Sequence, residues 1–338
     1  MPVSALSVIK SDSPEKWQVI LSDLITDPKE LLQILELEPP AETLSKSILK
    51  QFPLKAPRPY VARIEKGNWQ DPLLKQLWPE HLEDQSSPDY SLDPLAELSS
   101  NPVPGLLHKY AGRVLLTPVS HCAIHCRYCF RRHFDYQQNT PSKAGWTDAL
   151  DYIRQDQSIE EVIYSGGDPL AAADRHLAWL TEQIEQISHV KTLRIHTRLP
   201  ILIPQRVNQA LINWLTRSRL KVVMVLHVNH PRELDPAVAH AINTLSTNGI
   251  TMLNQSVLLK DVNDNSSVLA ELSKALFSIN VLPYYLHTLD KIQGVAHFDI
   301  PEPRALEIIE ELRKMLPGYL VPRLVRELPG QESKMALT

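Results

Sequence analysis

Cysteine is scarce in this chain, with only three among 338 residues, and all three fall within eight consecutive positions. They are Cys122, Cys126 and Cys129. An odd number of cysteines spaced this closely argues against a disulfide framework and indicates a metal site.

Long apolar runs and an excess of charge are also missing. The first twenty residues carry Lys10, Asp12, Glu15 and Lys16, which excludes a signal-peptide pattern there. No other stretch reaches the roughly 18 apolar residues of a membrane helix. We therefore expect a cytoplasmic protein with no membrane partner. A net charge of -4 and a pI near 6.4 give no reason to expect nucleic acid, and a small-molecule substrate fits better.

The first third of the chain has a helical pattern interrupted by proline. Ser13-Pro14 and Asp27-Pro28 each have the form of a helix start, with proline at the first helical position. Residues 84–104 are rich in Ser, Pro and Asp and are predicted to form a connecting loop. We assign residues 1–104 to a helical N-terminal region and linker.

From residue 113 onward, short β-rich runs alternate with amphipathic helical stretches, which is the pattern of parallel βα units. Six such units form either an incomplete barrel or an open doubly wound sheet, and the pattern alone does not separate the two. Both place ligands at the carboxyl ends of the strands. The expected strands are 113–119, 161–165, 192–197, 221–228, 251–258 and 282–286, and the expected helices are 146–155, 174–187, 205–216, 235–248, 265–280 and 302–315.

The cysteines follow the first of these strands with the spacing Cys-x3-Cys-x2-Cys. Three thiolates can hold three irons of a 4Fe-4S cluster and leave the fourth iron open for a substrate or cofactor. The alternatives are a structural zinc site completed by His121, His125 or His133, or three unconnected buried thiols. The second strand ends in Ser165-Gly166-Gly167-Asp168-Pro169, which by itself indicates an ordinary strand-to-helix turn.

The cysteine spacing, with an aromatic residue before the last cysteine, resembles the signature of the radical S-adenosylmethionine (SAM) superfamily. The resemblance implies an incomplete (βα)6 TIM-like barrel in which the open iron binds SAM and an electron from the cluster cleaves SAM to a 5′-deoxyadenosyl radical. The turn Ser165, Gly166, Gly167 and Asp168 is similar to the Gly-Gly-Glu-type turn that contacts the SAM amino group in that superfamily.

Further stretches resemble the lysine 2,3-aminomutase family, especially its branch that makes (R)-β-lysine for elongation factor P. They are 66–68, 71–74, 104–110, 126–134, 193–200, 253–259 and 282–287. The resemblance implies conversion of L-lysine to β-lysine with the cluster, SAM and pyridoxal 5′-phosphate (PLP). It also implies a reductant such as flavodoxin or ferredoxin, and an indirect link to elongation factor P through a separate ligase. A homo-oligomer remains open.

The family's functional residues match positions throughout the chain. Lys334, in a C-terminal segment spanning 317–338 after an α/β unit at 105–316, matches the lysine that carries PLP. Lys109 and Arg113 match positions near the PLP phosphate, and Gln255 a position near the cofactors. Arg131 matches the arginine that pairs with the substrate carboxylate, while Asp290 and Glu327 match two acids that receive the ε-ammonium of lysine.

Three alternatives to this function stay open at this point. A relative that makes (S)-β-lysine would carry the same motifs. An aminomutase that acts on another amino acid, such as glutamate, would need a cation in place of Asp290 and Glu327. A zinc-binding interaction module would need no SAM at all. Without the resemblance, the charged residues outside the cysteine loop are typical of solvated surface positions.

Overall fold

The computed structural model describes residues 16–39, 46–135, 139, 141 and 145–338. The helix start predicted at Ser13-Pro14 lies outside the described residues. In the described part of the chain, a nine-stranded sheet has its strands in chain order. The strands are β3 (Leu106–Tyr110), β4 (Arg113–Val119), β5 (Glu161–Gly166), β6 (Thr192–Thr197), β7 (Lys221–His227), β8 (Thr251–Val257), β9 (Leu282–His287), β10 (Arg323–Arg326) and β11 (Met335–Ala336).

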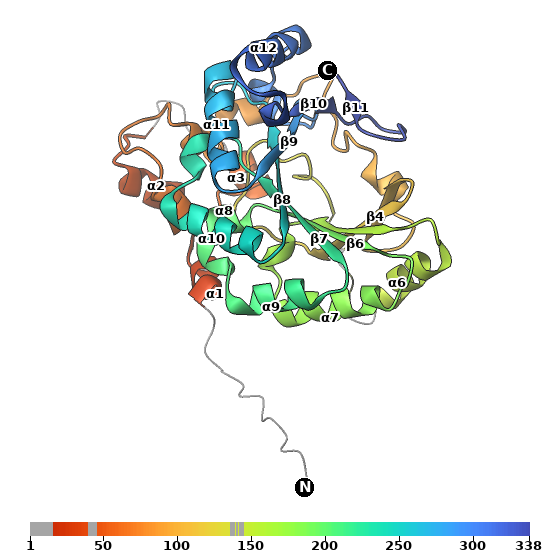
Figure 1. Ribbon diagram of the computed structural model, residues 1–338. Coiled ribbons are helices and arrows are strands. Elements are labelled where there is room, and N and C mark those ends of the chain that lie inside the picture. The colour runs from red at the N-terminus through yellow and green to blue at the C-terminus, as the bar shows by residue number, and fades with distance from the viewer. Residues whose placement is uncertain (1–15, 40–45, 136–138, 140, 142–144) are drawn as a thin grey trace.

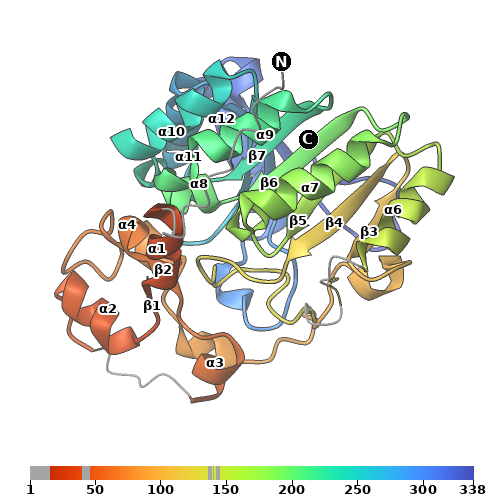
Figure 2. The same cartoon turned by 90° about the horizontal axis from the view of Figure 1, so that it is seen from below.

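The strand order decides between the two predicted architectures. Strands β4 to β10 are parallel to their neighbours, whereas β3 and β11 pair antiparallel at the two edges. Because the order never reverses, the sheet has no topological switch point and winds in one direction. Figures 1 and 2 show the sheet curving with helices on its outer face. The incomplete barrel is confirmed, with β10 as a seventh parallel strand that the sequence did not predict.

The barrel helices follow the strands closely, at the positions expected from the sequence. They are α6 (Trp146–Gln155), α7 (Asp174–Glu185), α9 (Gln209–Arg217), α10 (Pro236–Thr247), α11 (Ser266–Ser278) and α12 (Glu302–Met315), with a short α8 (Leu199–Leu202) after β6. Most ends agree with the prediction within two residues. The largest difference is the helix expected from residue 205, which begins at Gln209 because Pro204–Arg206 form a separate 3-10 turn.

Successive side chains along each strand point alternately to the outer core and to the barrel interior. On β5 and β6, Val162, Tyr164, Leu193 and Ile195 are fully buried within the apolar core that includes the outer helices. Their neighbours on the other face of the sheet point inward and are largely polar. The barrel interior is therefore a polar-lined space rather than a packed core.

The N-terminal region consists of short elements that pack against the barrel, beside α8 and α10 in Figure 2. They are α1 (Lys16–Ser22), β1 (Leu24–Ile25), α2 (Pro28–Leu35), α3 (Lys46–Gln51), β2 (Ala56–Pro57), α4 (Arg58–Val61), α5 (Pro72–Lys75) and the 3-10 helices η1 (His81–Asp84) and η2 (Glu97–Ser100). Asp27 caps α2 by accepting from the backbone of Lys29 at 2.9 Å, as its Asp-Pro start predicts. Trp17 and Tyr60 belong to the same core cluster as the barrel.

Two boundaries predicted from the sequence fall between elements. Residue 104 lies between η2 and β3, and residue 316 follows α12. The proposed division at these points stays a prediction. Among the described residues, we find no helix with the length and apolar character needed to cross a membrane.

Candidate active site

A cavity of about 740 Å³ lies inside the barrel, and every residue for which we predicted a role lines it. These residues come from strands, loops and the C-terminal segment, which are far apart in the chain. They are Lys109, Arg113, Cys122, Cys126, Cys129, Arg131, Ser165, Gly166, Gly167, Asp168, Gln255, Asp290, Glu327 and Lys334. The structure brings the predicted residues together, while the role of each stays a prediction.

The cavity extends along the barrel. Glu161, Ile163 and Ser165 line it from the first residue of β5 almost to the end of that strand. Arg113, the first residue of β4, lines it at the opposite end of that strand from the cysteine loop. We expected ligands at the carboxyl ends of the strands. The cavity includes these ends, but it also extends through the barrel interior to the amino ends of β4 and β5.

The N-terminal region holds the cysteine loop in place. The backbone N–H groups of His125 and Arg127 donate to carbonyl oxygens of that region. The guanidinium of Arg127 is fully buried and pairs with Glu83 of η1, which also pairs with Arg132. Glu83 thus neutralises two arginines that lie on either side of the last cysteine.

Burial acts on the cysteine thiols. It raises the pKa of Cys122 well above its ordinary value and the pKa of Cys129 to about 11, although Arg131 and Arg132 partly oppose the rise at Cys129. Because iron binds the thiolate, cluster assembly has to displace these protons. At Cys126, the guanidinium of Arg198 donates to Sγ at 2.9 Å and supplies a positive charge beside the sulfur.

Two histidines considered as a fourth zinc ligand have other partners. His125 Nδ1 lies 2.8 Å from Pro53 O, and its ring stacks on Phe52. His133 Nε2 lies 3.4 Å from Gln293 O. Within the ranges that the structure describes, no three His, Cys, Asp or Glu side chains converge on one metal position. A 4Fe-4S cluster needs no such convergence, because each cysteine binds a different iron.

The Gly-Gly-Asp turn after β5 packs directly on the cysteine loop. The backbone N–H of Asp168 donates to His121 O at 3.0 Å. A Cβ atom at Gly167 would lie 2.5 Å from that same oxygen, and Gly166 has a φ of +101°, which favours glycine. Both glycines are therefore required where the two loops approach one another.

The carboxylate of Asp168 is bound by the protein itself. It accepts from Thr197 Oγ1 at 2.6 Å, from Arg198 N at 2.8 Å and from Leu170 N at 3.1 Å. Burial raises the pKa of Asp168, although these hydrogen bonds oppose the change. Asp168 thus ties the end of β5 to the end of β6, and its contact with SAM stays a prediction.

We expect Gly167→Ala to disturb the cysteine loop, since the added methyl group would overlap the backbone of His121. Overpacking of this kind costs about 1–3 kcal/mol in the free energy of unfolding, and iron content after anaerobic reconstitution should fall. Gly318→Ala is the matched control, because nothing lies within 4 Å of its added atom. Equal iron content and equal thermal stability in the two variants would contradict the prediction.

Glu97 occupies one edge of the Arg131 guanidinium. Its two oxygens accept from Nε and Nη2, each at 2.7 Å, while Nη1 donates to Ser165 Oγ at 3.1 Å. Lys109 Nζ lies 3.3 Å from Glu97 Oε1. Burial would raise the pKa of Glu97, but Arg131 and Lys109 outweigh burial and lower it. A ligand carboxylate would meet Arg131 at the Nη1 edge beside Ser165. We did not predict Glu97, because its segment was assigned to a connecting loop.

Lys334 enters the cavity from the C-terminal hairpin, where Gly330, with a φ of +74°, forms the turn before it. Its Nζ pairs with Glu327, whose other oxygen accepts from Lys109 Nζ at 3.0 Å. Burial would raise the pKa of Glu327, but the two ammonium groups outweigh burial and hold it below its ordinary value. Burial, with Glu327 nearby, raises the pKa of Asp290 to about 7. A further cation would stabilise the ionised form of Asp290.

The cavity has polar atoms that the protein leaves without partners. Nε2 of His196 and Nε2 of His287 are buried, and neither has a hydrogen-bond partner among the described residues. Burial lowers the pKa of His287 to about 3 and that of His196 well below its ordinary value, so both rings are neutral. Among the ionisable cavity residues, seven are Lys or Arg and five are Asp or Glu. A polar anion such as PLP therefore fits this lining.

Arg113 and Gln255 both line the cavity wall. The guanidinium of Arg113 lies 4.8 Å from the ring centre of Tyr110. Gln255 on β8 is in register with His227 on β7 and Tyr285 on β9. Both side chains belong to the barrel wall, and their contacts with cofactors stay predictions.

Comparison with known proteins defines the class. Residues 116–272, which include the cysteine loop and the Gly-Gly-Asp turn, match the Radical SAM superfamily. The structure of a radical SAM methyltransferase from Sphaerobacter thermophilus is similar with a TM-score of 0.46 and 16% identity, covering 65% of this chain and 68% of that one. The sequence match and the site define a radical SAM enzyme, with a 4Fe-4S cluster and SAM as its cofactors.

Two curated relatives define the family. The chain is 48% identical over 330 residues to L-lysine 2,3-aminomutase of Escherichia coli (strain K12), covering 97% of this chain and 96% of that protein. It is 49% identical over 322 residues to L-lysine 2,3-aminomutase of Haemophilus influenzae, covering 95% of each. The chain belongs to the lysine 2,3-aminomutase family of radical SAM enzymes, which are isomerases. The resemblance found in the sequence is confirmed.

Proposed function

We propose that this enzyme converts L-lysine to (R)-β-lysine, with PLP carried by Lys334. The names of the curated relatives support lysine as the substrate. The observation that carries the proposal is the pair of acids, Asp290 and Glu327, in one cavity with Lys334. An amino acid with an ammonium side chain would satisfy these acids, whereas glutamate would bring a third negative charge to them.

The positions of the side chains in the cavity support the roles proposed for them. Arg131 would bind the substrate carboxylate at its Nη1 edge, beside Ser165. Asp290 and Glu327 would bind the ε-ammonium, so that the substrate is fixed at both ends and its reacting carbons are oriented between them. Leu95, Ile163 and Leu289 are apolar parts of the wall that exclude water. PLP, when bound, supplies the π-system through which an amino group migrates between neighbouring carbons.

Lys334 and Glu327 would have to separate for this function. In the structure Glu327 pairs with Lys334 as well as Lys109. If Lys334 carried PLP, its Nζ would no longer be a free ammonium beside Glu327, and Glu327, still paired with Lys109, would be available to a substrate ammonium. The same acid would therefore serve the lysine of the protein first and the lysine of the substrate afterwards.

Chiral analysis of the product tests the proposal. Protein reconstituted anaerobically with iron and sulfide should convert L-lysine to (R)-β-lysine when SAM, PLP and a reductant such as flavodoxin or ferredoxin are present. Omission of PLP should stop turnover. Formation of (S)-β-lysine would overturn the stereochemical assignment, and turnover of glutamate but not lysine would overturn the substrate.

The product also suggests a cellular role. We infer that the (R)-β-lysine serves the modification of elongation factor P through a separate ligase, so that the link to this factor is indirect. Loss of this modification in cells that lack the enzyme, with rescue by added (R)-β-lysine, is the expected result. Cytoplasmic location and a homo-oligomeric state remain predictions of the sequence.

Asp290 makes the proposed lysine site sensitive to pH. Because burial and Glu327 raise its pKa to about 7, Asp290 becomes protonated as the pH falls below that value. Lys334, Lys109 and Glu97 also act on this carboxyl. The substrate ammonium stays protonated throughout this range and binds the ionised acid, so kcat/KM for lysine should fall by about tenfold per pH unit below about pH 7.

Asp290→Asn should remove this acidic limb and should lower kcat/KM at pH 8 by about ten- to a hundredfold, as expected for a lost charged hydrogen bond. Asp151→Asn, at an ion pair on the surface of α6, is the matched control and should keep the wild-type profile. The prediction is wrong if the acidic limb persists unchanged in Asp290→Asn.

A further inference from the structure

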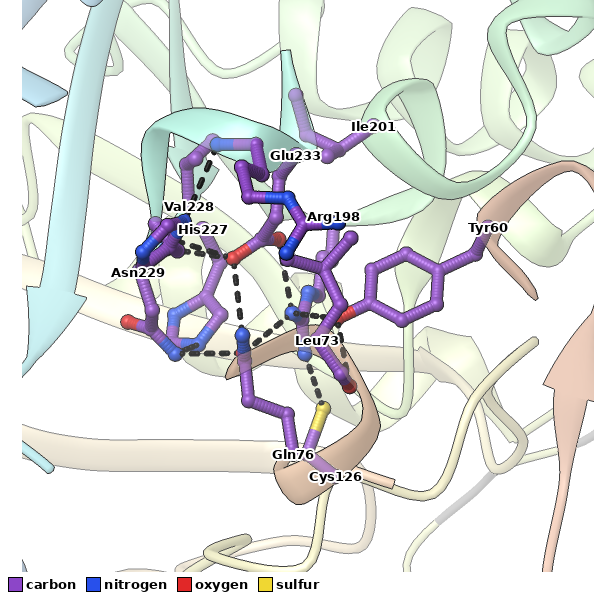
Figure 3. Close-up of polar contacts among 12 residues, drawn as sticks. Tyr60, Leu73, Gln76, Cys126, Arg198, Ile201, His227, Val228, Asn229 and Glu233 are labelled. Atoms are coloured by element: carbon purple, nitrogen blue, oxygen red, sulfur yellow. Dashed lines mark hydrogen bonds and ion pairs between the residues drawn. The ribbon is translucent and has the colours of Figure 1, made fainter. Parts of the chain in front are cut away.

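Arg198, for which the sequence suggested no role, lies directly behind the cysteine loop. It follows β6, and its side chain is only 5% exposed. Figure 3 shows its guanidinium between Cys126 and Glu233, with Nη1 donating to Cys126 Sγ at 2.9 Å. A buried charged group in contact with a cluster ligand has an electrostatic effect on the cluster itself, since little solvent screens it.

Residues from four parts of the chain fix the position of Arg198, three of them through its guanidinium and one through its backbone. Nη2 donates to Gln76 Oε1 at 2.7 Å and to Glu233 Oε2 at 2.8 Å. Nη1 also donates to the hydroxyl of Tyr128, in the cysteine loop, at 2.8 Å. The backbone N–H of Arg198 donates to Asp168 at 2.8 Å. The cysteine loop and the Gly-Gly-Asp turn therefore meet at this one arginine.

Glu233 balances the charge of Arg198 from the side opposite to Cys126. Its carboxylate is fully buried, and its Oε1 accepts from the backbone of Asn229 at 2.9 Å and of His230 at 3.1 Å. These contacts hold the acid in place without using Oε2, which faces Arg198. The net charge next to Cys126 thus depends on a cation and an anion that are both fixed.

Hydrogen bonds to cluster sulfurs and nearby positive charge favour the reduced cluster, which carries one more electron. We propose that Arg198 is a positioning residue that raises the reduction potential of the cluster through its bond to Cys126, and that Glu233 moderates this effect. The proposal rests on the cluster assigned to the family, and it is independent of the amino acid that the enzyme rearranges.

A purely structural role is the competing explanation, since Arg198 also joins the N-terminal region to the barrel through Gln76. A structural role predicts that the variants are less stable, but it does not predict opposite shifts of the reduction potential in Arg198→Gln and Glu233→Gln. Arg206 provides the comparison, because it is a fully buried arginine paired with Asp174 at 2.7 Å, outside the residues that line the cavity.

The test is a redox titration of the reconstituted cluster, followed by electron paramagnetic resonance without SAM or lysine. Arg198→Gln removes the positive charge, and the reduced fraction at a fixed potential should fall by about tenfold, which is about 59 mV for one electron. Arg198→Lys keeps the positive charge but lacks the planar guanidinium, so the reduction potential of its cluster should lie between those of Arg198→Gln and the wild type. Glu233→Gln leaves Arg198 unbalanced and should shift the potential in the opposite direction.

The paired variants separate the hydrogen bond from the charge. In the double variant Arg198→Gln with Glu233→Gln, both members of the ion pair are neutral, so a remaining downward shift measures the lost N–H···S bond. Arg206→Gln should lower the unfolding temperature and leave the potential unchanged. Opposite shifts in Arg198→Gln and Glu233→Gln support the proposal.

Other outcomes overturn it. Potentials equal to the wild type in both Arg198→Gln and Glu233→Gln, or shifts in the same direction, would show that Arg198 has a structural role only. If Arg198→Gln fails to retain a cluster, Arg198→Lys and Glu233→Gln decide by the same criterion, because the first keeps both charges of the pair and the second keeps Arg198.

Discussion

Lys334→Ala is expected to reduce conversion of lysine by at least about a thousandfold, as for other enzymes that lose the residue bonded to a reacting group. The cluster should be retained, because Lys334 lies on the C-terminal hairpin and the cysteines lie on the loop after β4. Borohydride reduction of the wild type with PLP should label the peptide that contains Lys334, and mass spectrometry of digests checks this directly.

Lys334→Arg separates the charge of Lys334 from its proposed bond to PLP. Arginine keeps a cation beside Glu327 but cannot bond PLP in the same way, so this variant should be as inactive as Lys334→Ala while retaining the charge of the ion pair. Lys314→Ala, at an exposed position on α12, should retain full activity. Substantial turnover by Lys334→Arg would show that Lys334 acts through charge alone and would contradict its bond to PLP.

Cys126→Ala is the second substitution with a large expected effect, because one iron of the cluster would lose its protein ligand. Iron and sulfide content, the broad visible absorption of the cluster and SAM-dependent turnover should all be lost. Loss of Cys126 also removes the acceptor of the Arg198 hydrogen bond and leaves a buried cation without that partner.

His121→Ala distinguishes this centre from the zinc site considered from the sequence. A Cys3His zinc site that used His121 would lose its metal in this variant, whereas the cluster should be retained. The iron and zinc content of His121→Ala protein purified without air distinguishes the two kinds of site.

For the cysteine variant, a Cys126→Ala protein with full iron content and activity would contradict the ligand assignment.

The cysteine motif and the periodic strands and helices could be predicted because their signals are local. The spacing of Cys122, Cys126 and Cys129 is a pattern within one loop, and α6 and α12 have apolar faces that repeat at the helical period. The strand and helix pattern alone did not decide between a barrel and a doubly wound sheet, because strand order depends on pairing between distant segments. The resemblance to the radical SAM superfamily favoured the barrel, and the structure confirms it.

Residues outside the motifs could not be assigned for the same reason. Glu97 lies in a segment without a regular period, and its partner Arg131 is 34 positions away. Arg198 and Cys126 are 72 positions apart. One signal was available: Arg194 and His196 alternate with the apolar Leu193 and Ile195 on β6, which indicates a strand with polar side chains on its inner face.

The β10 strand was missed because it is short and its neighbour is remote in sequence. It pairs with β9 through Arg323, Leu324 and Val325, and β11 returns beside it. The segment was predicted only as the carrier of Lys334. Its strands explain how a lysine so late in the chain reaches the barrel interior.

Deletion of the N-terminal region would remove its contacts with the cysteine loop. The superfamily match begins at residue 116, yet Glu83 and the carbonyls that receive His125 and Arg127 all precede that position. A fragment that starts at residue 105 would contain all three cysteines and still lack the groups that shape their loop. During synthesis the first hundred residues leave the ribosome before the barrel is complete, so we expect the cluster to form only after both sides of this contact have folded together.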